Sequence, residues 1–372
     1  MLVHWGKLEM RLIFDGHLDL ALFALAHNRD QTESVAQINA REVGMTDALE
    51  RGGATVSLPE MRRAGVAVCQ SSISARAKRE VQPVTGHRRI DLDYGTQRMA
   101  YAWAQGQLAY YRILEGQGEI KLIRTSGELD AHWGAWEQGG DESTPVGVIL
   151  SMECADPIVE PSQAEAWWED GLRSVMLAHF GFSHYAAGTG VSGPLTPKGI
   201  ELLKEFERVG MILDLTHLSD MSFYEALDRF NGPVIASHNN CRALVPGDRQ
   251  FSDEQIQRLI ARGAVIGAAL DAWMLVPDWV HGESSTEHVK LTTVVDHIDH
   301  VCQLAGNTLH AAIGTDTGAT YHMPSDFKTT EDLRKLEPIL VDRGYSDADI
   351  DNIFHANWRR FFRRWLPESS AC

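Results

Sequence analysis

The possible folds of the chain are limited most by eight short apolar runs, which recur along its length and alternate with longer amphipathic stretches. Each run carries four to six largely β-branched or aliphatic residues with little polar alternation. This pattern is typical of strands that are buried on both faces. The runs occupy residues 11–19, 66–73, 146–154, 173–179, 211–217, 233–238, 264–270 and 310–316.

Helix signals fill the stretches between these runs. Thr196 and Pro197 open an amphipathic segment that ends at Gly210, which predicts a capped helix over 196–210. Eight buried strands that alternate with helices favour a parallel (β/α)₈ barrel. An open doubly wound sheet is the alternative, but no glycine-rich phosphate loop follows the first strand. Further helices are predicted over 95–115, 219–230, 252–263 and 288–306.

We expect one barrel domain over residues 1–372. The segment at about 76–145 is richer in Arg, Gln and Gly, and we interpret it as an insertion holding the helix at 95–115 and loops. The segment at about 328–372 is expected to be a C-terminal helical extension.

Charge and composition limit the classes of partner. The 372 residues contain 34 Lys and Arg against 51 Asp and Glu, for a formal charge of −17. Such an acidic surface repels phosphate backbones and anionic lipid, so no nucleic-acid or membrane partner is expected. The chain has no run of 18 apolar residues, no signal-peptide pattern at its start and no CxxC pair among its five cysteines. We therefore expect a cytoplasmic protein without a disulfide framework.

Metal-binding and acid–base side chains follow the predicted strands where each one ends. In a parallel barrel these strand ends meet on one face, where functional groups gather. His17 and Asp19 are two residues apart on an extended segment, so their side chains point the same way and can bind one ion. The complete set is His17, Asp19, Glu153, His179, His217, His238 and Asp316.

These residue types predict hydrolysis. His217 and His238 can bind a second ion, and the two oxygens of Glu153 can bridge both. Two ions about 3.5–4 Å apart lower the pKa of water between them and polarise a carbonyl group. Asp316 can complete the first ion's ligands and carry a proton to the leaving amine.

Six spaced motifs between about residue 11 and residue 318 resemble the membrane dipeptidase family. This family is also called renal dipeptidase-like, or peptidase family M19, and belongs to the amidohydrolase superfamily. The motifs occur in the order typical of the family. They are DGHLD at 15–19, SMECADPI at 151–158, LTHLSD at 215–220, SHNNCRAL at 237–244, RQFSDEQI at 249–256 and IGTD at 313–316.

The resemblance implies a small-molecule hydrolase with two divalent ions, expected to be zinc, that cleaves dipeptides and often accepts a D-residue at the C-terminal side. It also suggests a homodimer. His179 would contact the substrate carbonyl and its oxyanion, and Arg249 would pair with the terminal carboxylate through its planar guanidinium. One zinc would be held by His17, Asp19, Glu153 and Asp316, and the other by Glu153, His217 and His238.

Two segments depart from the family pattern. The chain has GTDTGA at 314–319 where the family usually has GSDFDG, so Asp316 is kept but Gly318 replaces an acidic residue. The segment HFGFSHYAAGTG at 179–190 lacks the Asn and acidic pair common after the substrate histidine. Both segments are expected at the mouth of the barrel, which leaves substrate preference open.

Three other interpretations compete with a binuclear dipeptidase. A carboxylated lysine bridge is disfavoured because Lys121, the only Lys between 79 and 197, lies outside the predicted strands. Hydrolysis of N-acyl-D-amino acids or another small amide stays open, as does a catalytically silent metal-binding barrel.

The cluster at 296–300, which contains two Asp and two His, is interpreted as a polar or packing face of its helix.

Overall fold

A computed structural model describes residues 10–77 and 92–368 of the chain. The two ends of the expected domain and part of the expected insertion at about 76–145 lie outside the described residues.

Eight parallel strands form a closed (β/α)₈ barrel, as the sequence predicts. Strands β1 to β7 pair in the order β1-β2-β4-β5-β6-β7, and β8 pairs with β9. A parallel bridge between Ala236 and Ile266 joins the two sets, and the Asp316 N–H donates to the His17 carbonyl at 3.2 Å to close the ring. Each predicted run coincides with one strand, and only β2 and β5 extend one residue beyond their runs. The strands are β1 Ile13–Leu18, β2 Val66–Ser74, β4 Val146–Glu153, β5 Leu172–Met176, β6 Ile212–Asp214, β7 Val234–Ile235, β8 Ile266–Ala268 and β9 Ala311–Ile313.

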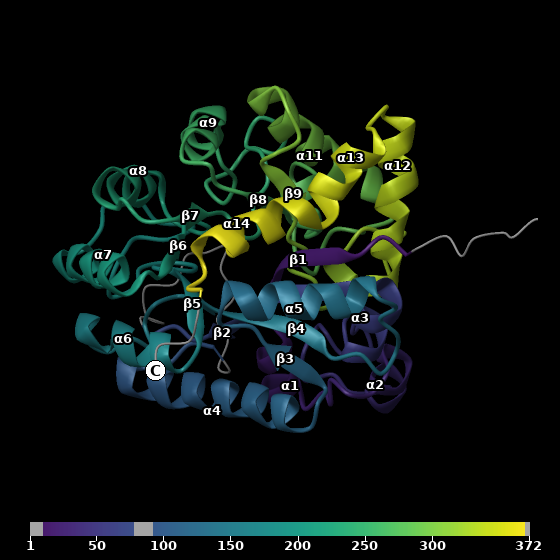
Figure 1. Cartoon of the computed structure of the whole chain (residues 1–372), viewed down its shortest axis with the longest axis horizontal. Coiled ribbons are helices and arrows are strands. Elements are labelled where there is room, and N and C mark those ends of the chain that lie inside the picture. The colour runs from purple at the N-terminus through teal and green to yellow at the C-terminus, as the bar shows by residue number, and fades with distance from the viewer. Residues whose placement is uncertain (1–9, 78–91, 369–372) are drawn as a thin grey trace, which may run out of the picture.

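Helices surround this barrel, with α7, α8, α9 and α11 ranged around the outside of the strands (Figure 1). All five helices predicted from the sequence are confirmed, as α4, α7, α8, α9 and α11. The helices are α1 Leu20–His27, α2 Val35–Arg41, α3 Leu58–Ala64, α4 Gln97–Gly116, α5 Ser126–Glu137, α6 Ala164–Glu169, α7 Pro197–Val209, α8 Asp220–Arg229, α9 Asp253–Ala261, α10 Ala272–Leu275, α11 Leu291–Ala305, α12 Leu336–Asp342, α13 Asp347–Asp351 and α14 Asn357–Trp365.

The expectation of only one helix and loops at about 76–145 is wrong. This segment also contains a short strand, β3 (Ile120–Leu122), and the helix α5. Strand β3 pairs in parallel with the first residues of β4, from Val146 to Val148. Its three residues contain only two apolar side chains, which is too short a pattern to stand out in the sequence.

Helix α14 packs against the barrel with its aromatic side chains. Trp358 and Phe362 belong to the same buried cluster as Phe14 and Ile212, and the rings of Phe14 and Phe362 stack 5.4 Å apart. Trp358 Nε1 also donates to the Ile313 carbonyl at 2.8 Å. In Figure 1 this helix lies across the strands. Since Phe14 is near the start of β1, the apolar packing leaves the carboxyl ends of the strands for polar groups.

The chain passes very close to itself beside strand β7. A Cβ atom on Gly267 or on Gly314 would collide with the Ser237 carbonyl oxygen. Glycine is therefore required at both positions for β8 and β9 to approach the end of β7, where His238 is placed.

Within residues 10–77 and 92–368, no helix is both long enough and apolar enough to cross a bilayer.

Candidate metal centre

The carboxyl ends of six strands bring all seven predicted side chains together. His17 lies near the end of β1 and Glu153 is the last residue of β4, while the remaining residues lie within three residues after their strands. Their ligand atoms fall into three overlapping groups, in each of which all atoms lie within 4.8 Å of one another. The groups are His17, Glu153 and His238; Glu153, His179 and His217; and His17, Asp19 and Asp316.

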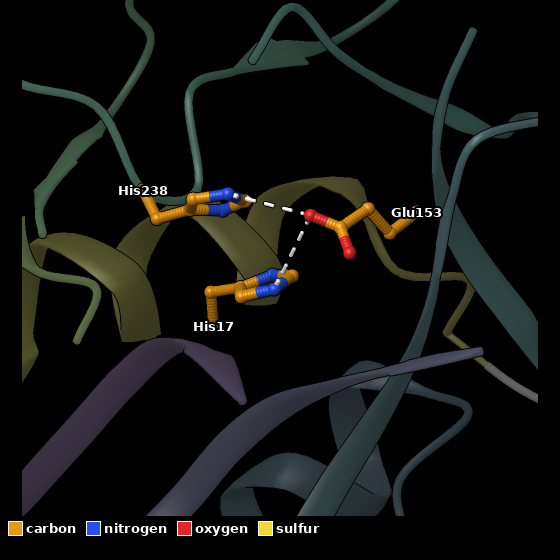
Figure 2. A group of neighbouring side chains, drawn as sticks. All are labelled: His17, Glu153 and His238. Carbon is orange, nitrogen blue, oxygen red and sulfur yellow. Dashed lines mark ion pairs between the residues drawn. The ribbon is translucent and has the colours of Figure 1, made fainter. Parts of the chain in front are cut away.

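Glu153 occupies the centre of this arrangement. Its Oε1 atom lies 3.7 Å from His17 Nε2 and 3.5 Å from His238 Nε2. Figure 2 shows both imidazole rings directed at the same carboxylate. The Nε2 atoms of His217 and His179 also lie close to this oxygen, at 3.4 Å and 3.6 Å.

These separations fit a site for metal ions. Two ligands that each lie 2.0–2.2 Å from a tetrahedral ion are roughly 3.3–3.6 Å apart, a distance too long for a good hydrogen bond. Among the described residues, neither ring nitrogen of His17 has a hydrogen-bond partner, although both are buried. The donor set of imidazole and carboxylate groups is also the one that zinc and similar ions prefer.

The charges of the cluster favour a cation as well. Burial raises the pKa of Glu153, and the negative charge of Asp19 raises it further. Burial likewise raises the pKa of Asp316. Carboxyl groups are hard to ionise so close together in a buried site, and a divalent ion would remove this penalty by neutralising them.

The histidines divide into two electrostatic classes. For His17, burial lowers the pKa, but the carboxylates of Asp19 and Glu153 outweigh it and raise the pKa to about 10. Burial holds the pKa values of His217 and His238 well below the ordinary range. These two imidazoles are therefore neutral at physiological pH, which is the form that binds a metal ion.

Hydroxyl groups hold the candidate ligands in place. Thr189 Oγ1 lies 3.1 Å from Nδ1 of His217, and Ser237 Oγ lies 2.9 Å from Nδ1 of His238. If each hydroxyl accepts the Nδ1 proton, Nε2 presents a lone pair to the cluster. Ser72 and Ser74 donate to Asp19, with Ser74 at 3.0 Å. No sequence signal pointed to Ser72, Ser74 or Thr189, because each acts from a neighbouring strand or loop, whereas Ser237 directly precedes His238 in the chain.

Two site residues have an unusual backbone conformation. His217 and Asp316 have φ angles of 69° and 52°, in the left-handed region that costs a non-glycine residue of order 1–3 kcal/mol. Both lie in turns directly after strands, where this conformation directs the side chain toward the cluster. The turn at Asp316 is fixed by Thr315, which donates its N–H and Oγ1 to the Asp15 carboxylate at 2.8 Å and 2.6 Å.

Arg249 lies beside the cluster and is almost fully buried, with 2% exposure. Its guanidinium donates to the His238 carbonyl and to Asn239 Oδ1, both at 2.8 Å. Burial lowers its pKa, while the charges of Asp316 and Glu153 partly oppose this. The family resemblance implies a carboxylate-binding cation at this position, and in the structure Arg249 also donates to the backbone of a candidate ligand.

Nearby histidines outside the predicted set are engaged elsewhere. His184, five residues after His179, makes a 2.9 Å contact with Asp156. The cluster at 296–300 is a packing and ion-pairing face, as predicted: Asp296 pairs with Arg343, and His300 pairs with Asp253.

The departure at 314–319 has a steric reason. A Cβ atom on Gly318 would collide with the ring of Phe23. An acidic residue therefore does not fit at this position while Phe23 occupies it. Asp316, two residues earlier, keeps its place in the cluster.

The chain therefore folds as an amidohydrolase-type (β/α)₈ barrel with buried histidines and carboxylates gathered at its strand ends. The profile of the membrane dipeptidase family, peptidase family M19, matches residues 8–366. The chain belongs to this family.

Similar proteins agree with this placement. Dipeptidase tcpJ of Claviceps purpurea is 32% identical over 200 residues, which cover 52% of this chain and 44% of tcpJ. Dipeptidase verJ of Clonostachys rogersoniana is 29% identical over 64% of this chain and 58% of its own length. The chain thus spans about half the length of these two relatives. In fold, it resembles a metallo peptidase from Rhodobacter sphaeroides with a TM-score of 0.77 at 21% identity, over 96% of this chain and 99% of the other.

Proposed function

We propose that the protein is a metal-dependent dipeptidase that uses two zinc ions. The observation that carries this proposal is the position of Glu153, whose single Oε1 atom lies 3.4–3.7 Å from the Nε2 atoms of four histidines. A carboxylate surrounded in this way is suited to bridge two ions.

The proposed ligands follow the geometry of the cluster. Glu153 would be shared between the ions. His217 and His238 would hold one ion, because their pKa values are lowered and their Nδ1 atoms face hydroxyl groups. His17, Asp19 and Asp316, whose ligand atoms lie within 4.8 Å of one another, would hold the other.

The ions, when bound, would activate water and polarise the scissile carbonyl group. Asp316 is the proposed proton carrier, since its raised pKa allows it to accept a proton and return it to the leaving amine. His179 is proposed to bind the carbonyl oxygen and its developing negative charge. Buried Arg249 is proposed to hold the substrate's terminal carboxylate through its remaining N–H groups.

The proposed substrate is a dipeptide with a D-residue at its C-terminal side. The Rhodobacter sphaeroides neighbour is liganded with a phosphinate mimic of the dipeptide L-Ala-D-Ala, and two relatives are named dipeptidases. Phe180 and Trp273 lie beside the cluster, with ring centroids 6.2 Å apart and Phe180 5.2 Å from His217. These rings would favour an apolar side chain.

A substrate panel tests the proposal. Zinc-loaded protein would be assayed with L-Xaa-D-Xaa dipeptides, L-Xaa-L-Xaa dipeptides and N-acyl-D-amino acids, with Glu153→Gln as a control. We expect turnover of the first class, with loss in the variant. Turnover of the acylated amino acids alone would reassign the substrate. No turnover in any class by fully loaded protein would contradict the proposed activity.

A further inference from the structure

The side chain of Arg76 touches the one histidine of the cluster that we do not propose as a metal ligand. Arg76 Nη1 lies 3.3 Å from Nδ1 of His179. A guanidinium has five N–H donors and no acceptor, so His179 Nδ1 is the acceptor in this contact. A neutral imidazole carries one proton, and in His179 that proton is therefore on Nε2, the atom that faces Glu153 at 3.6 Å.

His179 is therefore the opposite tautomer to its two neighbours, His217 and His238. The Nδ1 atoms of His217 and His238 face hydroxyl groups, which can accept a proton and leave Nε2 free to bind metal. Distance alone would make His179 a ligand as well, because its Nε2 lies within ligand range of Glu153 and His217. Binding an ion there would move the proton to Nδ1, where it would point at the guanidinium.

Arg76 is held firmly enough to impose this state. Its Nε and Nη2 atoms donate to the two carboxylate oxygens of Asp93 at 2.7 Å and 2.9 Å, and both side chains are buried. The Arg76 backbone is also fixed, since its N–H donates to the Leu92 carbonyl and its own carbonyl accepts from Tyr94, each at 2.7 Å. The two hydrogen bonds from Nε and Nη2 to Asp93 fix the plane of the guanidinium and direct its Nη1 atom at His179.

We propose that Arg76, oriented by Asp93, is a positioning residue that keeps His179 as an Nε2–H hydrogen-bond donor and prevents it from becoming a metal ligand. This inference rests on the proposed function, because the donor would serve the oxyanion of the substrate.

The proton position can be measured directly. Zinc-loaded protein with ¹⁵N-labelled histidine would be studied by long-range ¹H–¹⁵N NMR, and His179 would be assigned by its absence in His179→Gln. We expect His179 to be protonated on Nε2. A proton on Nδ1, or an Nε2 bound to metal, would overturn the proposal.

The role of Arg76 is tested by removing its donors. Arg76→Met leaves the buried Asp93 unpaired and could unfold the chain, so the main variant is the double substitution Arg76→Met/Asp93→Leu. We expect kcat to fall about 100-fold to 1000-fold with little change in KM, and the His179 proton to shift to Nδ1. Arg76→Lys keeps one donor and should retain the Nε2 proton and most of kcat. Arg124→Met is the matched control, because it removes another bidentate pair, with Glu115, away from the site.

These outcomes separate the two proposals. Unchanged kcat and unchanged protonation in the double variant would refute the role of Arg76, as would an equal loss in the Lys and Arg124 variants. The NMR result does not depend on turnover. If the His179 proton lies on Nε2 in the wild-type protein and on Nδ1 in the double variant while no dipeptide is hydrolysed, the proposed function fails and the role of Arg76 stands.

Discussion

Arg249 has two possible tasks, and the substitution Arg249→Met separates them. Its guanidinium is proposed to bind the substrate carboxylate, yet it also donates at 2.8 Å to the carbonyl of the candidate ligand His238. Loss of charge-assisted hydrogen bonds to a carboxylate costs about 2–4 kcal/mol, which corresponds to a decrease in kcat/KM of roughly 30-fold to 1000-fold. Leaving the buried His238 carbonyl unpaired would lower the free energy of unfolding by about 1–3 kcal/mol.

The assay compares dipeptides that have a free C-terminal carboxylate with the same dipeptides as C-terminal amides. If Arg249 binds the carboxylate, the substitution raises KM for the free acid and has little effect on the amide. Arg242→Met is the control, because Arg242 lies nearby but pairs with Asp220. Equal losses on the two substrates would refute carboxylate binding and show that Arg249 acts through His238.

Three further predictions follow from the site and its surroundings. His217→Ala should reduce turnover to less than about a thousandth while circular dichroism stays unchanged, and undiminished turnover would remove His217 from the ligand set. In metal-free protein the pKa values of Glu153 and His17 are raised, so both hold protons at neutral pH that an ion must displace. Zinc affinity in competition titrations should therefore increase with pH above 6, and an affinity independent of pH would contradict this. Gly318→Asp should lower the free energy of unfolding by about 1–3 kcal/mol, because the new side chain would collide with Phe23. Adding Phe23→Ala should restore part of this free energy. A thermal melt without any shift would show that the loop accommodates the side chain.

The barrel could be predicted because buried parallel strands leave a local signature. Each run is apolar over several residues, as in VGVILSMEC at 146–154, and the polar residue that follows marks the end of the strand. The strand β3 left no such signature. Helix α5 did have one, since Thr125 and Glu128 form a capping box that the sequence displays.

The candidate ligands were predictable for the same reason, but their supporting residues were not. Ser72 and Thr189 reach the cluster from other strands and loops, and Ser and Thr are too common to single out. Arg76 and Asp93 lie 17 positions apart, and only the fold makes them a pair that faces His179. The link from Arg249 to His238 likewise depends on how a loop folds back onto a strand end.

Metal stoichiometry shows whether the strand ends of the barrel form a centre for two metal ions. Elemental analysis would be carried out on protein loaded with zinc and then desalted, beside Glu153→Ala prepared in the same way. We expect about two equivalents in the wild-type protein and a clear loss in the variant, because Glu153 is proposed to bridge both ions. No bound zinc in the wild-type protein would show that these strand ends do not form a metal centre, and equal zinc in both proteins would contradict the bridging role of Glu153.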